Sequence, residues 1–86
     1  MENRLLFRRA ILSQLEAASP ASVPFETLAQ GLKLCGFRFS ERELRAAAEY
    51  LREKNYLSLS VSKISSSHTR AKLTADGLDY LESGEF

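Results

Sequence analysis

Two candidates for nucleophilic or acid–base chemistry stand out in this sequence, because each is the only residue of its type. His68 follows three serines, but no acid lies nearby in the sequence to orient its imidazole ring. Cys35 lies between Leu34 and Gly36, and the sequence names no partner that would activate its thiol. A single cysteine and a single histidine also exclude an internal disulfide, a multi-cysteine metal site and a pair of histidine ligands. We therefore predict no enzyme activity, no cofactor and no metal site, and we interpret Cys35 as a partly buried structural thiol.

The length and composition are those of one globular domain. The 86 residues are 44% hydrophobic and 27% charged, close to the average for folded proteins. No apolar run approaches the roughly 20 residues that cross a membrane, and Arg8 and Arg9 interrupt the first apolar stretch, unlike a signal peptide. The sequence therefore predicts a single domain over residues 1–86, located in the cytoplasm and without a membrane partner.

Charge is distributed unevenly along the chain, although the net charge is only +1. Residues 56–73 contain three lysines or arginines and no acid, whereas residues 74–86 contain four acids and no base. Such a separation of charge can steer an anionic partner to one face of a domain. Small domains also carry uneven charge by chance, so charge alone leaves both interpretations open.

Hydrophobic periodicity predicts a mostly helical α+β domain. The clearest helix start is Ser40, because Ser40 and Glu43 match a capping box, in which each side chain bonds the backbone N–H of the other residue. Gly36 and Asn55 are typical residues for helix ends. The expected helices span residues 3–18, 24–34, 41–54 and 75–83.

Two stretches near the C-terminus change from helical to alternating periodicity, which is typical of half-buried strands. The expected strands span residues 56–64 and 68–73 and form a hairpin around a serine-rich loop. The inward side chains would be Leu57, Leu59 and Val61 on the first strand, and Thr69, Ala71 and Leu73 on the second. A short linker at 20–23 precedes the second helix, with one extended residue at Val23.

The order of elements and several stretches of sequence resemble the winged helix-turn-helix superfamily of bacterial and phage regulators. Residues 26–32 look like its second helix, and residues 40–51 look like its recognition helix. The run Leu-Thr-x-x-Gly-x-x-Tyr-Leu at residues 73–81 looks like the return from the wing into the last helix. The resemblance implies a three-helix core, a β-hairpin wing and a short C-terminal helix. One departure is the segment 33–39, which is longer than the tight turn of the common bacterial forms.

The resemblance also implies a function, since in that superfamily the third helix enters the major groove of duplex DNA and the wing contacts the backbone. Arginine suits the guanine edge because its fork bonds two acceptors at once, and basic side chains on a wing attract phosphates. We therefore expect a small, sequence-specific transcriptional regulator that binds double-stranded DNA without a cofactor. The expected DNA contacts are Arg38, Ser40, Arg42, Arg45, Glu49, Lys63, Ser66, His68, Arg70 and Lys72.

The third helix also permits a second interpretation. Four bases alternate with four acids over residues 40–55, which gives the neutral outer face of an ordinary solvated helix. Glu49 lies at helix-neighbour spacing from both Arg45 and Arg52. Winged helices also serve as protein-interaction modules, so the alternative is an assembly adaptor that binds protein and not DNA.

The apolar stripe of residues 5–18 is wider than one small core needs. This predicts a homodimer interface on the first helix, and two-fold symmetry would then match two half-sites on DNA. The alternative is that the first helix is buried on two sides by its own domain. The expected interface residues are Leu5, Leu6, Arg9 and Leu12.

Overall fold

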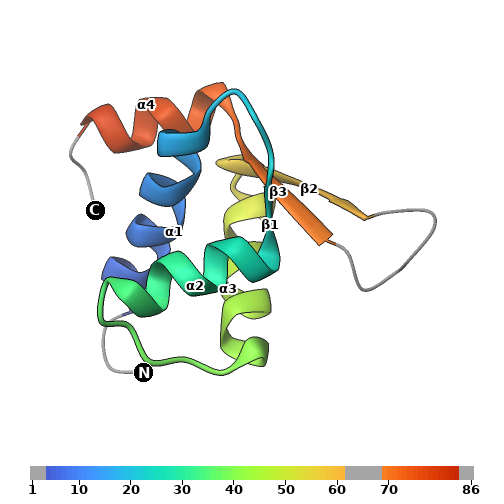
Figure 1. The fold of residues 1–86 in the computed structure, drawn as a ribbon. Helices are drawn as coiled ribbons and strands as arrows, with labels where there is room; N and C mark the ends of the chain where they lie inside the picture. The colour runs from blue at the N-terminus through green and yellow to red at the C-terminus, as the bar shows by residue number, and fades with distance from the viewer. Residues whose placement is uncertain (1–3, 62–68, 84–86) are drawn as a thin grey trace.

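The computed structural model describes residues 4–61 and 69–83 (Figure 1). Within these two ranges the chain forms four helices and a three-stranded antiparallel sheet, so the predicted α+β, mostly helical class is confirmed. The order is α1 (Arg4–Ala18), β1 (Val23–Pro24), α2 (Phe25–Leu34), α3 (Glu41–Glu53), β2 (Leu57–Val61), β3 (Thr69–Leu73) and α4 (Ala75–Ser83). None of the helices in these ranges combines the length and the apolar character that a membrane span requires.

The sheet contains one strand more than the predicted hairpin. β2 and β3 pair antiparallel from Leu57 opposite Leu73 to Val61 opposite Thr69. The linker before α2 is not only extended at Val23 but pairs with the other edge of β3, opposite Ala71. β3 is therefore the central strand, in the order β1-β3-β2, and the segment that leads into α2 is held by the hairpin.

Local signals account for both ends of α3. Ser40 Oγ accepts a hydrogen bond from the Glu43 backbone N–H at 3.1 Å, and Glu43 Oε1 accepts one from the Ser40 N–H at 2.9 Å, so the predicted capping box is confirmed. At the other end Asn55 has a φ of 65°, and the N–H of Tyr56 donates to the Leu51 carbonyl at 3.0 Å. This left-handed cap stops the helix and turns the chain toward β2.

The core lies between α1 and the inner face of the sheet. α1 contributes Phe7, Ile11, Leu12 and Leu15, which are all nearly inaccessible to solvent. The other helices and the strands contribute Leu28, Leu32, Leu44, Ala47, Ala48, Leu51, Val23, Leu57, Ala71 and Leu73.

The alternating sequence pattern predicts that Val61 points into the core, and this prediction is wrong. Val61 is 56% exposed, although its neighbours on the same face of the sheet, Leu57 and Leu59, are buried and half-buried. Val61 lies at the far end of the edge strand, where the hairpin extends beyond the helices (Figure 1). Alternation alone predicts which face a side chain occupies, not how far the helices cover that face.

The return from β3 into α4 is fixed by backbone contacts with the end of α3. Thr74 caps α4, since its Oγ1 accepts a hydrogen bond from the Gly77 N–H at 3.0 Å and donates one to the Asn55 carbonyl. The Thr74 N–H donates to the Tyr56 carbonyl at 3.2 Å. A methyl group added at Gly77 would overlap that same carbonyl oxygen. The Thr-x-x-Gly spacing therefore joins α4 closely to the chain that leaves α3.

Candidate nucleic-acid interface

The exposed side of α3 is bounded by two flanks with different neighbours. Leu44, Ala48 and Leu51 face the core, so the opposite side of the helix carries Arg42, Ala46, Glu49 and Glu53, which we call the outer face of α3. The flank toward α2 contains Arg45, whose Cζ lies 5.6 Å from the centre of the Phe25 ring. The flank toward α1 contains Tyr50, whose ring lies 3.7 Å from the Cζ of Arg8.

Two arginines of α3 form ion pairs along the helix. Arg45 donates from Nε and Nη2 to Glu41 Oε1, at 3.2 and 3.0 Å. Arg52 Nε donates to both carboxylate oxygens of Glu49, at 3.0 and 2.9 Å, and Glu49 raises the pKa of Arg52 above its ordinary value. Of its two helix neighbours, Glu49 therefore pairs with Arg52 and not with Arg45. Because all four side chains are exposed, each pair contributes little to stability, and each arginine can exchange its carboxylate for another anionic partner.

Arg42 differs from the other two arginines of α3. It is exposed at the N-terminal end of the outer face, and its side chain forms no ion pair or hydrogen bond with any of the residues that the structure describes. Arg38, in the segment before α3, is exposed as well. These two predicted contacts are thus accessible to a ligand that approaches the start of α3.

The long segment between α2 and α3 is anchored by aromatic contacts. The ring centres of Phe37 and Phe39 lie 5.6 and 5.1 Å from that of Phe7, so both rings pack on the core. Ser40, which follows this segment, uses its hydroxyl oxygen to cap α3. The extra length relative to a tight turn is therefore filled by two phenylalanines that fix where α3 begins.

The outer face of the sheet carries the predicted basic residues of β3. Arg70 and Lys72 are both exposed, opposite Ser60 and Ser58 of β2. Arg70 is also bound within the domain, because it donates from Nε to the Ser22 hydroxyl at 2.7 Å and from Nη2 to the Ser22 carbonyl at 3.0 Å. The guanidinium group thus ties the hairpin to the segment that leads into α2. The predicted contacts Lys63, Ser66 and His68 lie outside the described residues.

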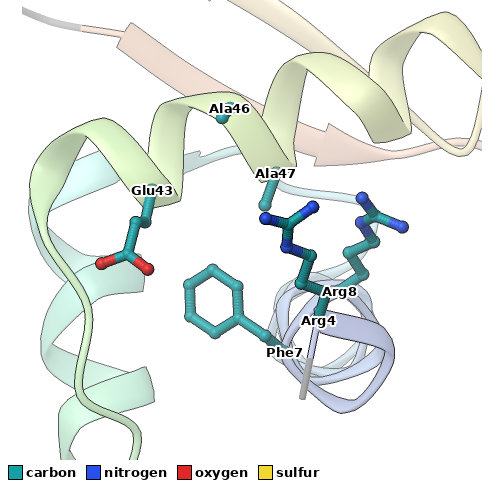
Figure 2. A pocket seen from close by; sticks show the side chains of 6 residues that line it. All are labelled: Arg4, Phe7, Arg8, Glu43, Ala46 and Ala47. Carbon is teal, nitrogen blue, oxygen red and sulfur yellow. The ribbon is translucent and has the colours of Figure 1, made fainter. Parts of the chain in front are cut away.

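A hollow between α1 and α3 contains two arginines that the sequence analysis missed (Figure 2). It has a volume of about 220 Å³ and is lined by Arg4, Phe7, Arg8, Glu43, Ala46 and Ala47. Both guanidinium groups rise from α1 toward α3 and lie side by side below it (Figure 2). The spacing of Arg4 and Arg8 places them on one side of a helix, but only the packing of α1 brings that side to α3.

A second hollow lies between α2 and α3 and has a volume of about 370 Å³. Its apolar wall includes Phe25, Phe39 and Leu44, and its rim carries charges of both signs. Lys33 Nζ lies over the Phe39 ring, 5.8 Å from its centre. Arg45 Cζ lies over the Phe25 ring, 5.6 Å from its centre. This hollow is therefore closer to neutral than the one beside α1, where two arginines face a single glutamate.

The predicted dimer interface needs one correction. Leu12 is 0% exposed because it packs in the core of its own domain, so it does not belong to an interface with a second copy. Leu5 and Leu6 are 42% and 49% exposed, and Arg9 is exposed. The apolar stripe of α1 is wide because its centre faces the core, while Leu5 and Leu6 extend it onto the surface.

The interpretation of Cys35 as a partly buried thiol is wrong. Cys35 is exposed, because it caps the end of α2 beyond Leu34, which is 89% exposed. Its sulfur atom lies 3.6 Å from Gln14 Nε2. Gly36, with a φ of +94°, then ends the helix as predicted. In the part of the chain that the structure covers, no three histidine, cysteine, aspartate or glutamate residues form a group that could hold a metal ion.

No protein-family model matches this chain, and neither the curated proteins nor the solved structures contain a significant match to it. The resemblance to the winged helix-turn-helix superfamily therefore stays a prediction, based on the residues and elements described above.

Proposed function

We propose that this chain is a winged helix-turn-helix protein that binds double-stranded DNA and acts as a small transcriptional regulator in the cytoplasm. In this proposal α3 is the recognition helix and the β2–β3 hairpin is the wing. The observation that carries the proposal is the position of Arg42. Its guanidinium group is exposed at the N-terminal end of the outer face of α3 and is not committed to another described residue.

Positive charge on the flanks of α3 supports this proposal. Glu41 and Glu49 are each neutralised by an arginine of the same helix. On the flank toward α1, Arg8 Cζ lies 3.7 Å and Lys54 Nζ lies 5.7 Å from the centre of the Tyr50 ring. Because the two strands of DNA border the groove that a recognition helix enters, basic groups beside the helix can contact phosphates.

The residues would have different roles. Arg42 is placed to read a base edge, where its two N–H groups can bond the O6 and N7 atoms of guanine. Arg38 and Lys72 are exposed bases suited to phosphates, which position the protein without reading sequence. Arg45 could join the interface after exchanging Glu41 for a phosphate, because an exposed ion pair costs little to break.

The test compares two arginines of the same helix. Arg42→Ala removes the uncommitted guanidinium group, whereas Arg52→Ala removes one that is paired with Glu49. We expect Arg42→Ala to weaken binding to a fluorescent duplex by at least tenfold, and Arg52→Ala to weaken it less than threefold. Equal effects of the two variants would show that α3 contributes only its general charge.

A protein-binding adaptor is the second candidate, and the hollow between α2 and α3 favours it. That hollow combines an apolar wall with charges of both signs, which suits an apolar side chain of a partner protein better than a phosphate. The adaptor would not bind DNA. Absence of duplex binding at low salt, together with retention of the fold, would make this the preferred function.

A further inference from the structure

We propose that the hollow between α1 and α3 is a phosphate site, in which Arg4 and Arg8 hold one phosphate of the DNA backbone beside the groove that α3 enters. The inference rests on the proposed function and adds a site on α1, which the sequence analysis did not assign to DNA. It is carried by two guanidinium groups that face the same 220 Å³ hollow (Figure 2).

The stacking of Arg8 on Tyr50 prepares this guanidinium group for a phosphate. Its Cζ lies 3.7 Å from the ring centre, so the plane of the group is supported by the aromatic face. A stacked guanidinium keeps its N–H groups free at the edge, and that edge matches two phosphate oxygens. Tyr50 itself is 38% exposed, which leaves this flank open to a ligand.

The composition of α1 supports an anion at this place. From Arg4 to Leu15, α1 contains three arginines and no acid. Arg4 and Arg8 are one helical turn apart, and like charges at this spacing repel each other. A phosphate bound between the two guanidinium groups would offset this repulsion.

The walls of the hollow leave room for a phosphate. Ala46 and Ala47 form the α3 side, and their methyl groups let a ligand approach the helix closely. Glu43 is the opposing charge at the rim. Its carboxylate is bound to the Ser40 N–H at 2.9 Å, and in Figure 2 it lies across the Phe7 ring from the two guanidinium groups.

The test is the salt dependence of binding to a fluorescent 20-base-pair duplex. We expect the double variant Arg4→Gln/Arg8→Gln to bind at least tenfold more weakly at low salt. We also expect its slope of log K against log salt to be less negative by about 0.9, the value for one lost phosphate contact. Arg9→Gln is the control for loss of a positive charge from α1, since Arg9 follows Arg8 in the sequence but does not line the hollow. Equal slopes for the double variant and wild type would overturn the site, while leaving the proposed function intact.

A titration of isotopically labelled wild-type protein with inorganic phosphate separates the site from the function. We expect saturable NMR shifts of the Ala46 and Ala47 amides and of the Arg8 Nε–H, which equal ionic strength of sodium chloride does not produce. The double variant should lose these shifts while keeping a folded spectrum. If wild type fails to bind duplex but shows the shifts, DNA binding is wrong and the anion site stands. If it shows no shifts, the site is wrong as well.

Discussion

Arg70 holds Ser22 through two hydrogen bonds, one to its hydroxyl at 2.7 Å and one to its backbone carbonyl at 3.0 Å. The two residues are 48 positions apart in the sequence, so this contact links the hairpin to the segment before α2. A basic residue that the superfamily resemblance assigns to DNA is thus also part of the scaffold. The neighbouring Lys72 faces the same side of the sheet and provides a comparison.

Arg70→Ala should therefore affect stability, whereas Lys72→Ala should affect only DNA binding. We expect Arg70→Ala to lower the free energy of unfolding by about 1 kcal/mol, because its two hydrogen bonds are exposed to solvent. Lys72→Ala should leave stability within about 0.5 kcal/mol of wild type. Urea denaturation followed by circular dichroism measures both. Equal stability of the two variants would mean that the Ser22 contact does not hold in solution.

Gly77→Ala should destabilise the fold, although alanine ordinarily favours helices. The added methyl group would overlap the Tyr56 carbonyl oxygen, and this backbone atom cannot move without disturbing the end of α3. We expect a loss of roughly 1–3 kcal/mol in the free energy of unfolding, as for other overpacked sites.

Gly31→Ala is the matched control for this prediction. Its added methyl group meets only the end of the Gln14 side chain, which can rotate away. Because alanine is favoured over glycine inside a helix by up to about 1 kcal/mol, this variant should be as stable as wild type or more stable. Thermal unfolding of both variants decides the matter, and a destabilised Gly31→Ala beside a neutral Gly77→Ala would contradict the packing described here.

The capping box of α3 should make stability depend on pH in the acid range. The Ser40 backbone N–H lowers the pKa of Glu43 below its ordinary value of 4.5. A lowered pKa means that the folded state favours the carboxylate. The contribution is therefore complete above pH 4.5 and is lost as the pH falls through the lowered pKa.

Glu43→Gln tests this dependence without removing the acceptor oxygen. Glutamine can still accept from the Ser40 N–H but does not titrate. We expect the variant to lose less stability than wild type between pH 5 and pH 3 on the denaturation curves. Parallel curves for the two proteins would show that another carboxyl group dominates the acid response.

Ser40→Ala should lower the free energy of unfolding by about 1 kcal/mol at neutral pH, the usual value for a lost N-cap.

The first helix provides a test of the homodimer prediction. Leu12→Ala should cost roughly 2–5 kcal/mol of stability, since Leu12 is fully buried in its own domain. Leu6 is half-exposed, so replacing it with serine should change stability much less. If Leu5 and Leu6 form a dimer interface, light scattering should give twice the chain mass for wild type and the monomer mass for Leu6→Ser. A monomer mass for wild type at working concentration would remove the dimer from the account.

Helix ends could be predicted because their causes lie within a few residues. Ser40 and Glu43 are one turn apart, and the positive φ of Gly36 and Asn55 is a property of each residue type. β1 was underestimated because its two residues take their pairing from β3, far along the chain. Val61 was misplaced for a similar reason, since its burial depends on where the helices end.

The candidate site could be predicted only in part from the sequence. The exposure of Arg42, Arg70 and Lys72 follows from periodicity. The bond from Arg70 to Ser22 and the approach of Arg8 to Tyr50 do not, because each joins elements that only the packing of the domain brings together. The ring of Tyr50 is partly exposed and supports the guanidinium group of Arg8 at the surface.

The most direct test of DNA binding is the fluorescence anisotropy of a generic duplex with the wild-type protein over a series of salt concentrations. We expect binding at low salt that weakens as salt is added, with log K falling linearly against log salt at a slope of about −0.9 for each phosphate contacted. We also expect a preferred sequence to bind more tightly than the generic duplex at the same salt concentration. Absence of binding at the lowest salt, from protein that circular dichroism shows to be folded, would contradict the proposed function.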